Sequence, residues 1–465
     1  MKLRKLTAAT GIILLMTGSW VFGSGQSSNG STAPKDSSAS GPFDWKRFSG
    51  KEITVYMVEH STSTALQSKL KDFEAQTGIK VNIQVTPEAN YFDQVSNALS
   101  SRSGTPDLFM SGVYQLWDYF TAGNVEPLDP YLSNPSLTVS DYDFNDIVSS
   151  TIGALRWDGV PGHPVGTGNL LALPLGCEIY SLAYNKRAFE KAGITKVPET
   201  YDELLEACDK LKEWNGPGSY AIALRGARDW GTIHPAYMST YANFGAKDFA
   251  IEGGKLVSKV NSPESVKMNQ FWVELVKRGG SPQWSTTYWY IGQAELGAGK
   301  AAMQWDADNN SIQVNLQNMA EGGNIAFAPM PVAKQGDPIK SNFWIWSMGM
   351  NANSKNKGAA WLFLQYFTGK AFLEYASVTG NNMDPVRTST WNSSGFKAKM
   401  ATQEGYIDTF NKTSSNATIL FTPQPAFFQT TLDWAESLQN MVAGTSTVQA
   451  ALDTLKQRMD RAVQE

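Results

Sequence analysis

The sequence is poor in the residues that build metal centres and disulfide frameworks. Its 465 residues include two cysteines, Cys177 and Cys208, and three histidines, His60, His163 and His234. Two cysteines are too few for a disulfide scaffold, and they lack the spacing of a metal site. Cys208 lies on an apolar helical stripe that suits a free thiol, but an oxidising compartment would also permit one bridge. Both states of the cysteines are compatible with the sequence.

An excess of positive charge is also absent. The 39 Lys and Arg residues are outnumbered by 43 Asp and Glu residues, which gives a formal net charge of -4 and an isoelectric point near 5.6. Because no basic field can collect phosphate backbones, we expect no nucleic-acid partner. The 42% hydrophobic and 18% charged shares are those of a globular protein. At roughly 150 residues per domain, the length predicts two to three domains.

Known catalytic motifs are missing as well. No HExxH or GxSxG pattern occurs, and Gly299-Lys300 lacks both the preceding glycine and the following Ser or Thr of a phosphate-binding loop. A glycoside-active enzyme would need two carboxylates facing one bond, about 5 to 10 Å apart. Nothing in the sequence marks such a pair among the acids. We therefore expect a protein that is not an enzyme and that carries no cofactor.

The amino terminus has the pattern of an export signal. Three cations within residues 1–5 precede an uncharged, apolar run that ends at residue 23, and a polar stretch follows. A transmembrane anchor is the alternative, but several Thr and Ser residues dilute the run, and about 20 strongly apolar residues would be wanted. The sequence predicts a signal peptide over residues 1–23. A flexible spacer, rich in Ser, Gly, Asn, Ala and Pro up to residue 42, is predicted over residues 24–48.

The end of this segment resembles a bacterial lipoprotein signal, in which a cysteine follows a small residue and receives lipid. Here the residue is Ser24. A hydroxyl cannot form the thioether, so we expect an exported protein, extracellular or at the cell surface, that lacks the tethering thiol. The spacer itself suits a surface tether.

Strand and helix patterns alternate from residue 53 onward. Apolar or alternating runs at 53–58, 79–85, 107–110 and 177–184 predict strands, and helical periodicity covers residues 91–101, 201–213, 357–368 and 448–463. Alternating units imply an α/β fold with a mostly parallel sheet. Ligands in such folds lie beyond the carboxyl ends of strands, which makes candidates of the residues that follow the first strands. These candidates are Glu59, His60, Ser111, Tyr114 and Gln115.

Aromatic residues make up 12% of the chain and include 15 Trp. Their flat faces suit stacking on the C–H surfaces of sugars, although filling the core is the more common role of a Trp. Trp230 and Trp289 lie in aromatic-rich, loop-like stretches. Each is either a stacking platform or a core residue.

The most informative stretch is LPLGCEIYSLAYNK, residues 173–186, followed by the capping-box pattern of Thr200 to Glu203. This stretch closely resembles the family 1 extracellular solute-binding proteins, which include the maltose-binding proteins. In that family the strand crosses between two lobes and carries a sugar-binding glutamate, and by this resemblance the glutamate is Glu178. A carboxylate suits the role because its oxygens accept from neighbouring sugar hydroxyls.

Further pieces that resemble the family follow in order along the chain. Residues 105–109 and 299–303 resemble the segments before two cleft loops, residues 341–344 resemble a second crossing between lobes, and residues 384–387 resemble a later turn. Two features depart from the family: an insertion at residues 162–169, and Glu59 and His60 after the first strand. The resemblance adds these ligand-binding candidates: Trp305, Asp306, Asp308, Asn342, Trp344 and Arg387.

The resemblance implies a two-lobed periplasmic-binding-protein-like fold with hinge-linked lobes and a ligand cleft between them. The expected lobes are residues 49–176 with 346–418, and residues 177–345 with 419–465. Such a protein would be a monomer that captures a carbohydrate, expected to be an oligosaccharide, and delivers it to the permease subunits of an ABC importer. The alternatives are an exported glycoside-active enzyme and an anion- or metal-binding protein of the same fold.

Overall fold

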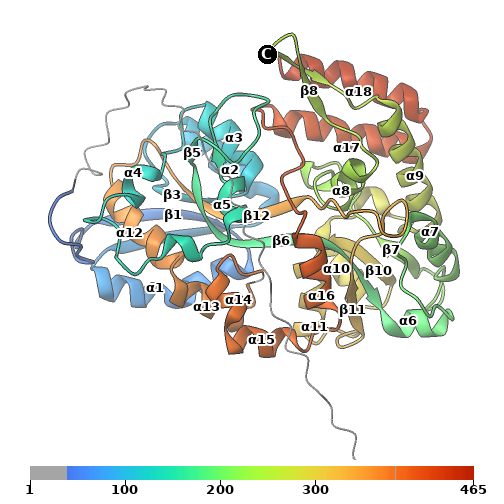
Figure 1. Ribbon diagram of the computed structural model, residues 1–465, viewed down its shortest axis with the longest axis horizontal. Coiled ribbons are helices and arrows are strands. Elements are labelled where there is room, and N and C mark those ends of the chain that lie inside the picture. The colour runs from blue at the N-terminus through green and yellow to red at the C-terminus, as the bar shows by residue number, and fades with distance from the viewer. Residues whose placement is uncertain (1–38, 383, 465) are drawn as a thin grey trace, which may run out of the picture.

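The computed structural model describes residues 39–382 and 384–464, and in it the chain forms two α/β lobes that lie side by side (Figure 1). The predicted signal peptide lies outside the described residues. The first lobe is built around strands β1, β2, β3 and β12, and the second around β7, β10 and β11. Strand β6 belongs to both.

The sheet of the first lobe has the order β2–β1–β3–β12–β6. Strands β1 (Glu52–Val58), β2 (Lys80–Thr86) and β3 (Leu108–Ser111) are parallel, as the alternating pattern predicts. Strand β12 (Phe343–Met350) comes from far along the chain and lies antiparallel between β3 and β6. Helices α1 (Ser61–Thr77), α2 (Glu88–Ser100) and α3 (Val113–Thr121) follow the three parallel strands, so their first residues lie at the carboxyl edge of the sheet.

The sheet of the second lobe is smaller. Strand β10 (Ala301–Ala307) is parallel to β7 (Tyr220–Ala223) and antiparallel to the end of β6, and β11 (Ile325–Ala328) pairs with β6 on its other side. Helix α10 (Trp289–Gly297) precedes β10 and packs on it, and α11 (Asp308–Leu316) follows it directly. Two C-terminal helices, α17 (Phe427–Ala443) and α18 (Val448–Ala462), pack on α9 (Pro263–Gly279).

Strand β6 (Ala172–Asn185) joins the two lobes, as the sequence predicts for the strand at 177–184. Its first part, up to Ile179, pairs with β12, and its second part, from Tyr180 onward, pairs with β10 and β11. All but one of its residues are buried, which explains why the run reads as almost wholly apolar. A single continuous strand therefore carries Glu178 between the lobes.

Helix α7 (Tyr201–Lys210) begins with the predicted capping box. The Thr200 side chain accepts from the Glu203 backbone, and the Glu203 carboxylate accepts from the Thr200 backbone. The helix ends before the predicted residue 213, because the chain enters a turn in which Glu213 and two nearby glycines have positive φ. No helix within 39–382 or 384–464 is both long and apolar enough to cross a membrane.

The segment from Phe43 to Phe48, predicted as part of the spacer, packs on the first lobe. Phe43 contacts Trp45 edge to face with ring centroids 5.1 Å apart, and Trp45 contacts Tyr366 at 6.0 Å. The Phe48 ring lies against helix α12 (Lys357–Phe367) at Gly358, where an added Cβ would lie 2.2 Å from it. The lack of a side chain at Gly358 thus allows this packing.

The sequence is compatible with either a bridge or two free thiols. In the structure, Cys177 lies on β6 and Cys208 on α7. Both are buried and free. Cys208 fills the space left by a glycine, since a Cβ at Gly279 would lie 2.4 Å from its sulfur. Of the two states that the sequence allows, the structure has the free thiols.

Candidate functional site

A cavity of about 360 Å³ lies between the lobes. The first lobe lines it with residues that follow β1, with the start of α2 and with β12, and the second lobe lines it with α10, α11 and the segment after β7. Its lining residues are Glu59, His60, Ser61, Glu88, Glu178, Arg225, Trp230, His234, Trp289, Tyr290, Gln293, Ala294, Asn309, Asn310, Gln313, Gln317, Met319, Trp344 and Trp346.

Six of the predicted candidates are brought together in this lining. They come from opposite ends of the sequence and from both lobes, which is what a cleft closed by two lobes requires. The six are Glu59, His60, Glu178, Trp230, Trp289 and Trp344.

Strand β12 supplies two indoles to the cavity. Trp344 and Trp346 are two residues apart, so the alternation of a strand places both on the same face. Their rings meet edge to face with centroids 5.0 Å apart, and Trp230 of the second lobe approaches Trp344 at 5.5 Å. The His60 ring lies 5.2 Å from Trp346. The result is an aromatic wall contributed by both lobes.

Gly112, directly after β3, makes room for this wall. A Cβ at this position would lie 1.9 Å from Cη2 of Trp344. The predicted loop after β3 therefore provides space for an indole. The three candidates of that loop, Ser111, Tyr114 and Gln115, are buried and do not line the cavity.

Tyr114 and Asn342 bond to each other beneath the cavity. Asn342 donates from Nδ2 to the Tyr114 hydroxyl at 2.7 Å and to the His234 carbonyl at 2.6 Å, and its Oδ1 accepts from the Leu420 backbone at 3.0 Å. The Tyr114 ring stacks on Phe427 at 4.4 Å. Asn342 thus ties three chain segments together at the second crossing, away from the lining.

Glu178 lies at the end of the first-lobe part of β6, with its carboxylate toward the cavity. The Trp346 indole donates to its Oε1 at 3.1 Å. Burial raises the pKa of Glu178 to about 8, with Asp306 and Glu88 adding repulsion, while Arg225 and the Trp346 bond act in the opposite direction. At neutral pH this side chain is therefore able to donate as well as accept a hydrogen bond.

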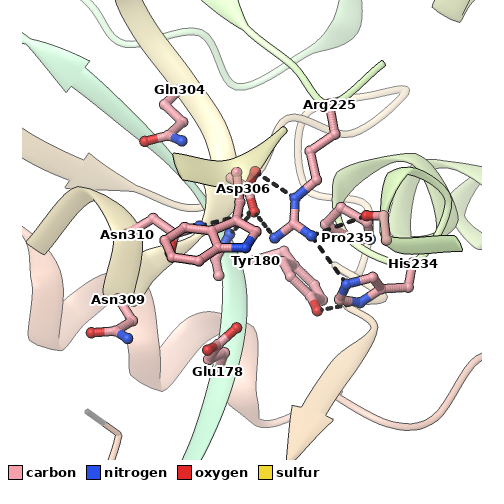
Figure 2. Close-up of polar contacts among 12 residues, drawn as sticks. Glu178, Tyr180, Arg225, His234, Pro235, Gln304, Asp306, Asn309 and Asn310 are labelled. Carbon is pink, nitrogen blue, oxygen red and sulfur yellow. Dashed lines mark hydrogen bonds and ion pairs between the residues drawn. The ribbon is translucent and has the colours of Figure 1, made fainter. Parts of the chain in front are cut away.

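Arg225 follows β7 and is the only cation in the lining. Its Nε donates to Asp306 Oδ2 at 2.8 Å and its Nη2 to Asp306 Oδ1 at 2.6 Å, a two-pronged pair that Figure 2 shows. Both side chains are buried. Asp306, a predicted ligand contact, thus pairs with Arg225 and does not line the cavity.

His234 continues this polar chain (Figure 2). Arg225 Nη1 lies 3.2 Å from His234 Nε2, and His234 Nδ1 lies 2.8 Å from the Tyr180 hydroxyl. Because a guanidinium only donates, Nε2 is the acceptor and Nδ1 carries the proton. Burial, followed by the charge of Arg225, lowers the pKa of His234 well below its usual value. The ring is therefore neutral, and it stacks on Trp230 at 5.2 Å.

Glu88 and Trp289 meet from opposite lobes. Glu88 begins α2 and Trp289 begins α10, and the indole nitrogen donates to Glu88 Oε2 at 3.0 Å. Burial raises the pKa of Glu88 to about 7, and the charge of Arg225 and the bond from Trp289 oppose this increase.

Three further candidates lie outside the lining. Trp305 is buried and packs on Trp272 at 5.8 Å. Arg387 is fully buried and donates to the backbone carbonyls of Thr368, Tyr142 and Asp143. The family-like turn at Arg387 therefore serves the fold of the first lobe.

The third of these candidates, Asp308, faces another acid. It begins α11 and lies against the buried carboxyl of Asp384, which accepts from the Tyr406 hydroxyl. Burial, followed by the nearby Asp384, raises the pKa of Asp308 well above its usual value, and burial raises that of Asp384 to about 7. Two carboxyl groups this close share a proton.

None of the amides in the lining was among the predicted candidates. Asn309, Gln313 and Gln317 recur every four residues along α11 and its end, so they share one face of the helix. Their side chains bond in series, from Gln317 to Gln313 and from Gln313 to Asn309, each at 3.2 Å. The spacing of four residues could have indicated this polar stripe from the sequence. No motif or periodicity near Arg225 or His234 indicates that they line a cavity.

Two lobes, a crossing strand and a cavity of carboxylates, amides and indoles define a ligand-binding protein of the two-lobed periplasmic class. A solved solute-binding protein of Agrobacterium vitis S4, with bound D-mannitol, has this fold: the TM-score is 0.73 at 26% identity, over 89% of this chain and 99% of that one. A solute-binding protein of Agrobacterium radiobacter K84 in complex with ribitol matches with a TM-score of 0.76 at 20% identity, over 90% and 100% of the two chains. The predicted fold class is confirmed.

The chain belongs to the bacterial extracellular solute-binding protein family, which matches residues 59–372. It is similar to the erythritol/L-threitol-binding protein of Mycolicibacterium smegmatis, with 39% identity over 409 residues, 88% of this chain and 85% of that protein. The predicted family is thus confirmed.

Proposed function

We propose that this protein captures a small, uncharged polyol or sugar in the cavity and delivers it to the permease subunits of an ABC importer. The observation that carries the proposal is the cavity itself. Its volume of about 360 Å³ lies near the lower end of the roughly 300 to 1,000 Å³ usual for ligand pockets. This volume favours a ligand of one unit over the oligosaccharide expected from the sequence.

The chemistry of the lining suits a ligand that is rich in hydroxyl groups. Glu178, Glu88 and the amides of α11 offer both donors and acceptors, and the indoles of Trp344 and Trp346 offer apolar faces to C–H groups. The guanidinium of Arg225 is already paired with the Asp306 carboxylate. The lining contains more acidic side chains than cationic ones. An anionic ligand would therefore meet repulsion without a free cation to bind it.

The comparisons support the same class of ligand. The relative that is 39% identical is an erythritol/L-threitol-binding protein, and the mannitol-bound protein is 26% identical. We therefore propose a linear polyol of about four to six carbons as the ligand, with the six predicted residues of the lining among its contacts.

Capture would involve closure of the lobes about two crossings. The change of sheet after Ile179 in β6 and the start of β12 at Phe343 support hinges at these positions. They also support lobe boundaries near those expected, at 176/177 and 345/346. A ligand that contacts both lobes shifts the equilibrium toward the closed form by its differential affinity for it. We further propose that the exported protein acts as a monomer.

Titration calorimetry with erythritol, L-threitol, ribitol, D-mannitol and maltose tests this proposal. We expect one polyol to bind with a stoichiometry of one, and Glu178→Ala to weaken it at least about tenfold by removing a buried hydrogen-bonding group. Glu190→Ala, an exposed residue of α6 (Lys186–Lys191), is the matched control and should bind as the unmodified protein does. Absence of binding to every compound, or turnover of one of them, would contradict the proposal.

A further inference from the structure

The hydrogen bond between Trp289 and Glu88 joins the two lobes within the lining of the cavity. Glu88 is the first residue of α2, which packs on β1 of the first lobe, and Trp289 is the first residue of α10, which packs on β10 of the second. The indole nitrogen donates to Glu88 Oε2 at 3.0 Å. The bond joins two helix ends, each fixed to the sheet of its own lobe, so opening the lobes must break it.

We propose that Glu88 and Trp289 form a latch that holds the lobes closed and slows the release of the ligand. This inference extends the proposed function, since it assigns to two residues of the same cavity a role in closure beyond any contact with ligand. Trp289 then acts through Glu88 as a positioning residue, and its indole N–H is the group that matters.

Neighbouring contacts across the cleft have a different character. Phe92 of α2 meets Trp230 edge to face at 5.6 Å and Phe428 of α17 at 6.4 Å. Such ring contacts are compatible with a range of centroid distances, roughly 4.5 to 7 Å. The Trp289–Glu88 bond is directional, and hydrogen bonds weaken steeply when their geometry is lost. It therefore distinguishes the closed arrangement more sharply than the rings beside it.

Charged groups of the second lobe surround Glu88, and the Trp289 indole donates to it. Its carboxyl group faces Asp229 and Asp306 of the second lobe, which repel it when it is charged, and Arg225, which attracts it. Arg225 is already paired with Asp306. The indole N–H is thus the one donor from the second lobe that the described residues place on Glu88.

Spin labels at Asn97→Cys and Ala298→Cys, exposed positions on α2 and at the end of α10, report the distance between the lobes by electron–electron double resonance. Because the native thiols of Cys177 and Cys208 are buried, the spin-label reagent should not react with them. We expect Trp289→Phe, which keeps the ring and loses the N–H, and Glu88→Ala to lengthen the distances in protein without added ligand. Glu88→Gln keeps an acceptor and should restore the closed population.

Ligand release is the second measurement. By stopped flow, Trp289→Phe and Glu88→Ala should release a bound polyol about tenfold faster, the worth of one hydrogen bond to a carboxyl group. Trp391→Phe, which removes an indole N–H bonded within the first lobe to the Pro385 carbonyl, and Asn90→Ala, exposed on α2, are the controls. Both should leave distances and release rates unchanged.

Unchanged distances in Trp289→Phe, or a Glu88→Gln variant as open as Glu88→Ala, would overturn the latch. These distances need no ligand. If no polyol or sugar binds the unmodified protein, the proposed function fails, while the spin-label distances still decide whether the latch exists.

Discussion

The indole nitrogen of Trp346 lies 3.1 Å from Oε1 of Glu178, so that the aromatic wall and the central carboxyl group are joined by a hydrogen bond. The two residues belong to paired strands, β12 and β6. The bond fixes the orientation of Glu178 before any ligand arrives, which reduces the ordering that binding must impose.

Replacing Trp346 by Phe should weaken binding of the ligand about fivefold to tenfold, because about 1 kcal/mol is lost with one neutral hydrogen bond. The pKa of Glu178 should rise further, since the indole bond is one of the interactions that lower it. Titration calorimetry across pH 6 to 9 measures both. Trp214→Phe, a buried Trp outside the lining, controls for the smaller ring. Equal losses in the two variants would contradict the role of the bond.

The acid pair at Asp308 and Asp384 should make stability depend on pH. The pKa of Asp384 is raised to about 7 in the folded protein, against about 4 when unfolded. The stabilisation is therefore complete below about pH 4 and is lost as the pH rises through about 7, with a slope near -1.4 kcal/mol per unit. Urea unfolding of Asp384→Asn between pH 5 and 8 should show a flatter decline than the unmodified protein. Parallel curves would argue against a shared proton.

Breaking the Arg225–Asp306 pair should be costly. Arg225→Ala or Asp306→Ala alone leaves a buried charge without its partner, and each should lower the free energy of unfolding by about 3 to 5 kcal/mol. The double variant should lose less than the sum, because the two residues interact directly. Arg278→Ala breaks a more exposed pair with Asp209 and should cost about 1 kcal/mol or less. Additive losses in denaturant unfolding would show that the pair is not coupled.

Gly112→Ala should disturb the aromatic wall. The added methyl group would lie 1.9 Å from the Trp344 ring, so the indole must move. We expect altered near-ultraviolet circular dichroism and polyol affinity that is weaker by about tenfold or more, since a displaced stacking face loses contacts that depend on distance. Gly123→Ala provides the comparison for the loss of a glycine, because nothing lies near its Cβ position, although its positive φ will cost some stability. Unchanged polyol affinity in Gly112→Ala would contradict the role of Gly112 in making room for the Trp344 ring.

The parts of the fold and site that follow short-range patterns were predictable. Strand β6 is an apolar run buried on both faces, which a local pattern identifies. Glu178 and Trp344 were predicted from the resemblance to the family, and both line the cavity. The alternation of a strand also separates Trp305 from Asp306. They are consecutive on β10, so their side chains must face opposite ways. Trp305 accordingly packs on Trp272, and Asp306 pairs with Arg225.

Other parts depend on contacts between distant residues. Arg225 and Asp306 are 81 positions apart, and Glu88 and Trp289 are 201 apart. No periodicity links such partners, since each lies in a pattern typical of its own helix, strand or loop. Arg387 illustrates the converse, because a family-like turn marks a residue that holds backbone carbonyls within one lobe. Sequence order located the cleft, but pairing across it required the three-dimensional structure.

The position of β12 also bears on how the chain folds. This strand lies in the middle of the first sheet, between β3 and β6, yet it begins at Phe343. The amino-terminal half therefore cannot complete its own sheet until about three quarters of the polypeptide is available, and pairings this distant in sequence form slowly. A newly made chain would thus remain loosely structured for much of its synthesis.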